Sequence, residues 1–340
     1  MTQAGALMAA EIAEQPDVLA RLLARQADPL AEIAAAVRAR APRFALFAAR
    51  GTSDHAALYA KYLVETKLAL PAGLVSPSTM TIYNARPALD DVLFVAVSQS
   101  GGSPDLVDSL STARACGALT LAVTNSPASP LAQAAELSAD VAAGAELAVA
   151  ATKTYTAELL ALYLVMAGWA GLDTGSAAQV PEAATRTLAH GDRVEAAADR
   201  YRFADRLVTT ARGYSYPTAR EAALKLMETS YVGAQAFSGA DLLHGPMAMV
   251  DAGVPVIAIR TPGAGGQAMD PVIAKLTDVG ADVLLVGPDN GLPVATEGVD
   301  AALSPILEIL PLQQLSWRLA LNRGGDPDAP RGLRKITETY

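Results

Sequence analysis

The chain has 340 residues, a formal net charge of −9, 51% hydrophobic residues and only 5% aromatic residues. No basic face dominates such an acidic chain, which excludes the classes that bind nucleic acid or an anionic membrane through a positive field. A single cysteine, Cys116, excludes an internal disulfide framework and a multi-cysteine metal site.

Glu11 and Glu14 interrupt the apolar run that an N-terminal signal peptide would need, and no later stretch offers roughly 18 consecutive apolar residues. We therefore expect a soluble, cytoplasmic protein with no membrane partner.

The length fits two α/β domains of ordinary size. Residues 1–40 show helical spacing and predict leading helices, broken near Pro16 and Pro29. From Phe44 onward, buried apolar runs alternate with helical patterns. Predicted strands are 44–49, 73–76, 92–97 and 119–124, and predicted helices are 53–67, 103–116 and 152–171. This alternation predicts a doubly wound parallel sheet in a first domain at 41–175.

The second half repeats this plan after a boundary predicted at 172–179. Ala211-Arg-Gly-Tyr-Ser215 repeats Ala49-Arg-Gly-Thr-Ser53 at an offset of 212 − 50 = 162 residues, in each case between a strand and a helix. Further strands are predicted at 206–210, 254–259 and 282–286. We interpret the chain as a tandem duplication, with a second domain and an irregular tail at 195–340.

The strand at 92–97 ends in a loop that is suited to bind an oxyanion. Ser98, Gln99 and Ser100 precede two glycines, and Ser103 and Pro104 are typical of the start of a helix. Free backbone N–H groups and the helix dipole would then face the ligand. The alternative is an ordinary strand-to-helix turn with serine caps. The counterpart in the second half, 260–266, has no serines, which indicates one phosphate site per chain.

Three charged residues, Glu221, Lys225 and Glu228, share one face of a predicted helix because their spacing is i, i+4 and i+7. One interpretation is a solvated ladder of ion pairs. The other is an acid–base site, because the helix follows a strand, where open α/β sheets bind ligands. No histidine pair or acidic triplet has metal-ligand spacing, so we expect neither a metal nor a cofactor.

Two further residues have an open interpretation. His244-Gly-Pro246 predicts a turn that holds the imidazole at a loop tip, either as a structural histidine or as a proton-transfer group. Residues 322–335 predict an irregular basic tail, either disordered or bringing Lys335 to a sugar carbonyl, where an amine forms an imine.

Six ordered motifs resemble the isomerase half of glucosamine-6-phosphate synthase, a double sugar isomerase (SIS) domain. They are 50–53, 98–101, 149–153, 221–228, 244–246 and 330–335. The resemblance implies two tandem flavodoxin-like αβα subdomains. It also implies that Ser98, Gln99, Ser100 and Ser103 bind a sugar phosphate, whereas Thr52, Ser53 and Val149 line the sugar.

The same resemblance implies roles in the chemistry. Glu228 matches the base that moves a proton between C1 and C2, and Lys225 and Glu221 match its polar supports. His244 matches a ring-opening residue that the neighbouring subunit contributes, which implies a homodimer with shared sites, and Lys335 matches the lysine that forms an imine. Met227 and Ala151 depart from the pattern, which leaves the substrate detail open.

Synthases carry an N-terminal glutaminase domain with a cysteine nucleophile, whereas this sequence begins MTQAG. We therefore expect no ammonia release from glutamine, and the resemblance is to stand-alone glucosamine-6-phosphate deaminases, which form fructose 6-phosphate and ammonia. The alternatives are a fructosamine-6-phosphate deglycase, another phosphosugar isomerase, and a non-catalytic sugar-phosphate sensor.

Overall fold

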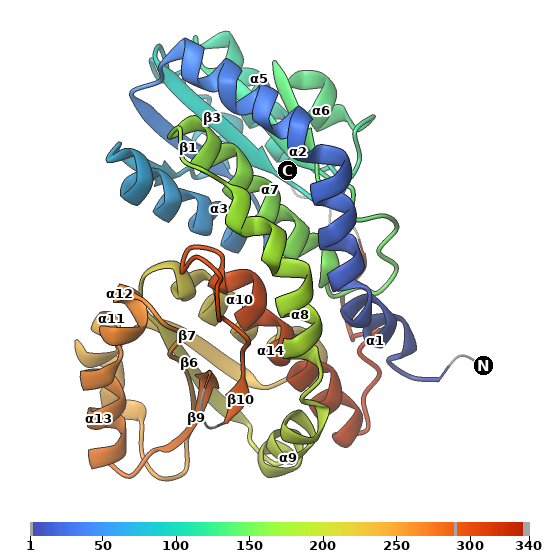
Figure 1. Cartoon of the computed structure of the whole chain (residues 1–340), viewed down its shortest axis with the longest axis vertical. Coiled ribbons are helices and arrows are strands. Elements are labelled where there is room, and N and C mark those ends of the chain that lie inside the picture. The colour runs from blue at the N-terminus through green and yellow to red at the C-terminus, as the bar shows by residue number, and fades with distance from the viewer. Residues whose placement is uncertain (1–2, 289–290, 336–340) are drawn as a thin grey trace. The chain divides into compact units, whose positions relative to one another are not determined.

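The computed structural model describes residues 3–288 and 291–335. The chain forms two compact units that interleave along the sequence. The first unit contains residues 17–146 and 153–178, and the second contains 3–16, 147–152 and 179–335. The start of the chain and the short segment 147–152 therefore belong to the second unit, although its sheet comes later in the sequence (Figure 1).

The first unit is a parallel five-stranded sheet in the order β2-β1-β3-β4-β5. Its strands are β1 (Phe44–Ala48), β2 (Ala72–Leu74), β3 (Val92–Val97), β4 (Leu119–Thr124) and β5 (Leu137–Asp140). Its helices are α2 (Gln15–Arg40, from Asp17 onward), α3 (Thr52–Leu63), the π-helical turn η1 (Val64–Leu68), α4 (Pro77–Thr81), α5 (Pro104–Ala115), α6 (Pro130–Ala134), α7 (Lys153–Trp169) and the 3-10 turn η2 (Gly175–Gln179).

The second unit contains a second parallel five-stranded sheet, in the order β10-β9-β8-β6-β7. Its strands are β6 (Arg206–Ala211), β7 (Gly233–Ser238), β8 (Pro255–Ile259), β9 (Asp282–Gly287) and β10 (Leu292–Pro293). Its helices are α1 (Ala6–Ala13), α8 (Val180–Leu188), α9 (Gly191–Tyr201), η3 (Gly213–Ser215), α10 (Tyr216–Ser230), α11 (Gly239–Leu243), η4 (Pro246–Met249), α12 (Ala264–Gln267), α13 (Asp270–Asp278) and α14 (Ser304–Asn322).

The two sheets have the same topology. Counted from the first strand of each unit, both follow the order 2-1-3-4-5 of flavodoxin-like folds. β1 and β6 occupy equivalent central positions, and each leads into the repeated Arg-Gly-x-Ser loop. The predicted fold class, two tandem α/β subdomains with parallel sheets, is confirmed.

Helices cover both faces of each sheet, as continuous apolar strands require. In the second unit, α11 and α13 share one hydrophobic cluster with β6 and β8, centred on Val208, Leu242, Val256 and Leu276. α10 packs against α14 and against β6 and β7 (Figure 1). No helix in the described ranges is long and apolar enough to span a membrane.

The prediction of a break at Pro29 is wrong. α2 runs without interruption from Gln15 to Arg40 and includes Pro29. A proline inside a helix costs about 3 kcal/mol. Here Leu22, Leu30, Ile33 and Val37 are buried on both sides of it, and this apolar face offsets the cost.

The duplication extends to a buried pair of side chains. In the first unit, the Ser53 hydroxyl donates to Glu158 Oε1 at 2.9 Å, and in the second unit Ser215 donates to Glu308 Oε1 at 2.8 Å. Each serine closes the Arg-Gly-x-Ser loop, and each glutamate lies on the long helix of its unit, α7 or α14. Each pair therefore ties the loop after the central strand to a buried helix.

Glu308 is fully buried and also accepts a hydrogen bond of 2.5 Å from Thr261 Oγ1. Burial raises the pKa of this carboxyl, and its hydroxyl partners oppose the shift only in part. The folded chain therefore loses the Glu308 proton only at a pH above 4.5, the ordinary pKa of a glutamate side chain.

We predict that the wild-type chain loses stability relative to Glu308→Gln as the pH rises. A raised pKa contributes stability that is fully present below the unfolded pKa and is lost as the pH rises through the folded pKa. Urea unfolding of both proteins between pH 4 and pH 8 measures this difference. The exposed Glu297→Gln is the matched control. A difference for Glu308→Gln that stays constant with pH would contradict the prediction.

Candidate functional site

The serine loop of the first unit follows β3 and leads into α5, as predicted. Ser98 is buried, whereas Gln99, Ser100 and Ser103 are half-buried. Ser98 Oγ accepts the Gly101 N–H at 3.2 Å, and Ser100 Oγ accepts the Gly102 N–H at 3.3 Å. Ser103 occupies the N-cap position of α5, but its side chain makes no capping hydrogen bond. The loop is therefore a tight turn whose hydroxyls lie at the start of a helix.

The glycines of this loop have different surroundings. Gly101 has a φ of +62°, and a Cβ there would overlap the Ser129 hydroxyl. Gly102 and Gly51 are exposed, and a Cβ on either would meet no atom closer than 3.8 Å. Gly101 therefore allows the turn itself, whereas open space lies at Gly102 and at Gly51.

The equivalent loop of the second unit is filled. A Cβ on Gly266 would collide with the Thr261 carbonyl oxygen, and one on Gly265 would lie 2.7 Å from the Arg212 oxygen. The backbone of this loop therefore packs on itself and on the Arg212 loop. Both its missing serines and this packing are consistent with one phosphate site per chain.

The Arg50 loop lies against the start of α5. Arg50 Nη2 is 2.8 Å from Asp105 Oδ2, and Asp105 is almost fully buried. Thr52 is the half-buried first residue of α3, and the Ser53 hydroxyl is already donated to Glu158. Ser53 can therefore only accept a further hydrogen bond.

The second unit holds a buried cluster of charges on α10. Lys225 Nζ lies 3.3 Å from Glu221 Oε1 and 2.6 Å from Glu228 Oε2. The side chains of Lys225 and Glu221 are 1% and 0% exposed, whereas that of Glu228 is 22% exposed. The interpretation as a solvated ladder is therefore wrong. Two buried groups support one carboxylate that solvent can reach.

The charge of Lys225 is maintained by its neighbours. Burial alone would lower the pKa of its ammonium group, but the carboxylates of Glu221 and Glu228 outweigh this and hold the pKa above its ordinary value. Lys225 is therefore a fixed positive charge at neutral pH.

The helix carries this cluster away from the sheet edge where the sequence argument placed it. α10 begins at Tyr216, just after the carboxyl end of β6, and Glu228 lies 228 − 216 = 12 residues later, about 18 Å along the axis. The cluster's exposed member therefore lies at the opposite, amino-terminal edge of the second sheet. We correct the placement: the predicted strand-to-helix position holds only for the start of α10.

His244 lies at the other edge. β7 pairs with β6 in parallel, with Ser238 opposite Ala211, and α11 follows directly. His244, which ends α11, is exposed at this carboxyl edge. The structure therefore does not bring His244 and Glu228 of one chain together.

The described part of the tail, which ends at residue 335, crosses the last turn of α10. Tyr231 follows this helix, and its hydroxyl accepts the Arg331 N–H at 2.9 Å. The Arg331 guanidinium lies 4.0 Å from the centre of the same ring. Lys335 Nζ then donates to the Ala148 carbonyl at 2.7 Å, next to the half-buried Val149. Lys335 and Val149, distant in sequence, are thus brought together.

Sequence reasoning missed several residues of this arrangement. In the sequence, Glu11 only interrupts the apolar run that a signal peptide needs, yet in the structure it is buried and accepts the N–H groups of Leu147 and Ala148. A usable signal was present, because Glu11 lies on the same helix face as the buried Met8 and Ile12. Asp328, which caps α1, had no comparable local signal.

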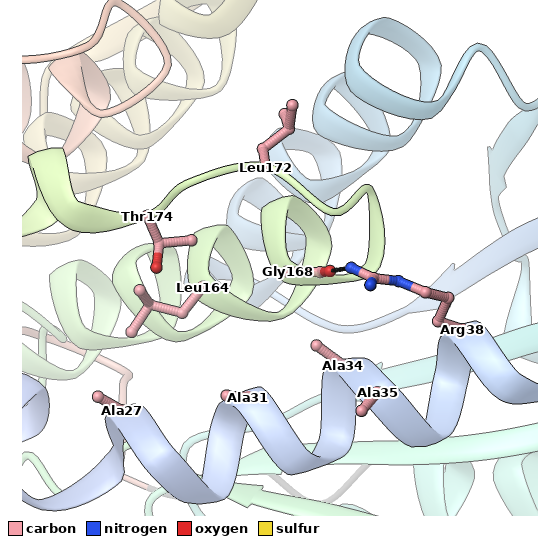
Figure 2. A pocket seen from close by; sticks show the side chains of 9 residues that line it. All are labelled: Ala27, Ala31, Ala34, Ala35, Arg38, Leu164, Gly168, Leu172 and Thr174. Carbon is pink, nitrogen blue, oxygen red and sulfur yellow. Dashed lines mark hydrogen bonds between the residues drawn. The ribbon is translucent and has the colours of Figure 1, made fainter.

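A hollow of about 270 Å³ lies in the first unit between α2 and the end of α7 (Figure 2). Alanines of α2, including Ala27, Ala31 and Ala35, form most of one side. Arg38 donates to the carbonyls of Gly168 and Trp169, and so caps α7. We do not assign the site to this hollow, because its polar lining is limited to Thr174 and to the engaged Arg38.

Comparison with known proteins identifies the family. A family model described as SIS domain matches residues 41–167 and 201–303. The chain belongs to the SIS domain family. Within this SIS protein, the two matches contain the two sheets.

Three relatives illustrate the similarity. The glutamine–fructose-6-phosphate aminotransferase (isomerizing) of Methanothermobacter thermautotrophicus is 35% identical over 302 residues, 85% of this chain and 50% of that protein. A solved protein of Silicibacter pomeroyi, provisionally designated a phosphosugar isomerase, is 35% identical with a TM-score of 0.85, covering 94% of this chain and 99% of that one. The C-terminal domain of glucosamine-fructose-6-phosphate aminotransferase from Francisella tularensis is 25% identical with a TM-score of 0.83, covering 94% and 97%.

This SIS protein spans about half the length of the curated relatives that it matches. The two ranges matched by the family model contain the serine loop and the charge cluster.

We predict that Lys225→Met lowers the free energy of unfolding by about 3–5 kcal/mol, because it leaves the carboxylate of Glu221 buried without its counter-charge. Urea unfolding at pH 7 measures the change. Lys275→Met, on the exposed side of α13, is the matched control and should cost less than about 0.5 kcal/mol. Equal effects of the two substitutions would show that the cluster does not behave as a buried ion pair.

Proposed function

We propose that this SIS protein converts glucosamine 6-phosphate to fructose 6-phosphate and ammonia. The observation that carries the proposal is the buried Lys225 between Glu221 and Glu228. Burying such a group costs several kcal/mol for each ion, so packing alone does not account for it. A carboxylate that solvent reaches, held by a fixed cation, is suited to take a proton from carbon.

The proposed reaction divides into three steps. Ring opening exposes an aldehyde at C1. Glu228 then removes the proton from C2, the C1 oxygen is protonated, and an enolamine forms. Glu228 returns the proton to C1, which leaves a hydroxymethyl group at C1 and an imine at C2. In the last step, water replaces the nitrogen at C2, and ammonia and fructose 6-phosphate leave as the products.

Other residues have supporting roles in this proposal. Ser98, Gln99, Ser100 and Ser103 bind the phosphate, and their position at the start of α5 supports this role, because a helix N-terminus favours anions. Lys225 offsets the negative charge that develops as the proton leaves C2. Lys335 takes part in the last step: its amine adds to C2 and ammonia leaves, and water then hydrolyses the lysine imine of the ketose, which releases fructose 6-phosphate and the free amine.

Thr52, Ser53 and Val149 line the sugar in the same proposal. The Ser53 hydroxyl is donated to Glu158, so Ser53 would accept a hydrogen bond from a sugar hydroxyl.

His244 opens the ring, and we propose that a second copy of the chain supplies it. The support is its position: within one chain, His244 lies at the edge of the second sheet opposite to Glu228. A homodimer with shared sites would bring the two residues to one substrate.

The proposal is tested by incubating the full chain with glucosamine 6-phosphate and measuring ammonia and fructose 6-phosphate. We expect both products in equal amounts, and a loss of about 10²–10⁴-fold in kcat for Glu228→Gln. Glu182→Gln, at an exposed position of α8, is the matched control. Activity of Glu228→Gln equal to that of the wild type would refute the role of Glu228.

The same assay separates the rival functions. If a fructosamine 6-phosphate is hydrolysed and glucosamine 6-phosphate is not, the chain is a deglycase. If fructose 6-phosphate or another sugar phosphate binds by calorimetry but none is converted, the chain is a sensor. Either outcome rejects the deaminase proposal.

A site shared between two copies of the chain predicts that two inactive variants complement each other in mixed dimers. Glu228→Gln and His244→Asn should each be inactive alone, whereas co-expression should restore about 25% of wild-type activity, because half of the dimers are mixed and each mixed dimer has one intact site. Activity of the co-expressed, mixed sample is compared with that of each variant alone. A fully active monomer in solution, or no recovery in mixed dimers, would contradict the shared site.

A further inference from the structure

The short segment Leu147–Thr152 is held at both ends by residues of the second unit. At its start, the Glu11 carboxylate accepts the N–H of Leu147 and, at 3.3 Å, that of Ala148. At its end, Gln313 Nε2 donates to the Thr152 carbonyl at 3.2 Å. Gln15 in turn donates to Gln313 at 2.8 Å. The backbone beside Val149 is therefore fixed from two sides.

Lys335 is bound to the same backbone. Its Nζ donates to the carbonyl of Ala148, whose own N–H is held by Glu11. The peptide groups of Ala148 thus link the Glu11 carboxylate of α1 to the Lys335 amine of the tail. A shift of Glu11 would move the acceptor that holds the Lys335 side chain.

The tail closes this arrangement into a ring of contacts. Asp328 Oδ2 and Oδ1 accept the N–H groups of Leu7 and Met8 at 2.9 and 2.8 Å, and so cap the first turn of α1. Asp326 Oδ1 accepts the Gly5 N–H at 2.9 Å. A carboxylate at a helix N-terminus is further stabilised by the helix dipole. α1 therefore contacts the tail at one end and, through Glu11, the lysine's acceptor at the other.

We propose that Glu11 is a positioning residue for Lys335. It acts through the Ala148 peptide group, with Asp328 anchoring the tail that delivers the lysine. A carboxylate that is 4% exposed is costly to bury unless it is hydrogen-bonded, and here its partners are the N–H groups of Leu147 and Ala148. Through these hydrogen bonds, the Glu11 carboxylate fixes the backbone whose Ala148 carbonyl binds the Lys335 amine. The inference rests on the proposed function only for the chemistry of Lys335.

The first test measures the position of Lys335 without any enzyme activity. The full chain is labelled briefly with an amine-acetylating reagent, and modification of Lys335 relative to the exposed Lys275 is quantified by peptide mass spectrometry. In Glu11→Gln, we expect Lys335 to react at least about 5-fold faster than in the wild type, because its acceptor is no longer fixed. Glu14→Gln, at the exposed C-cap of α1, is the matched control and should leave the rate unchanged.

A second variant tests whether the contacts act as one ring. Asp328→Asn should also expose Lys335, and the double variant should show less than the product of the two single effects, because both release the same amine. Glu11→Asp keeps the charge but withdraws the carboxylate, and its labelling rate should lie between those of the wild type and Glu11→Gln. Circular dichroism confirms that each protein is folded; if Glu11→Gln does not fold, Asp328→Asn and Glu11→Asp carry the test.

The second test uses kinetics. Glu11→Gln should lower kcat for glucosamine 6-phosphate by roughly 10²-fold with little change in KM, because a misplacement of about 1 Å has that effect and the serine loop makes none of these contacts.

An unchanged labelling rate for Lys335 in folded Glu11 and Asp328 variants overturns the inference, whatever the activity. Faster labelling in a chain that converts no amino sugar phosphate supports the positioning by Glu11 and rejects the proposed function. Faster labelling of Lys335 with an unchanged kcat would show that the position of Lys335 does not matter for catalysis, and would reject that part of the inference.

Discussion

The buried ammonium of Lys225 is the group on which the rest of the candidate site depends. A lysine that is buried away from solvent stays charged only if carboxylates lie next to it. Glu221 and Glu228 provide these carboxylates from the same face of α10. Their spacing works only while α10 is regular through its last turn. That turn is fixed by core contacts: the hydroxyls of Thr229 and Ser230 donate to the Ser316 carbonyl of α14. The position of Glu228 is thus set by the packing of two helices.

The sequence predicted the central strands well, because β1, β3, β4, β6, β8 and β9 are largely apolar runs in which most residues are buried. It missed β5, β7 and β10, which lie at sheet edges and include short or polar runs such as Leu-Ser-Ala-Asp. An edge strand is defined by its neighbour rather than by its own pattern. For this reason the predicted order of strands and helices is correct for the centres of both sheets, although three of the four edge strands were not predicted.

The sequence predicted which residues belong to the candidate site better than it predicted how they are arranged. Glu221, Lys225 and Glu228 came from local helical spacing, which a sequence shows directly. The position of Glu228 at the far end of α10 follows from the length of the helix, so it was within reach of the sequence. The ring formed by Glu11, Ala148 and Lys335 depends on contacts between distant segments. Such contacts leave no periodic signal. The burial of Glu11 could be inferred from its helix face, but neither its partners nor the capping by Asp328 could be derived from the chain alone.

The contact between Asp328 and α1 has a consequence for how the chain reaches its native state. It joins residues 320 and 321 positions apart. Closing a loop of that length costs about 5 kcal/mol in entropy, which no single helix cap repays. We therefore expect α1 to dock late, after α14 and the second sheet have formed and brought the tail close. During synthesis, α1 emerges first but lacks its cap until residue 328 has been made, so the backbone that holds Lys335 should be fixed late.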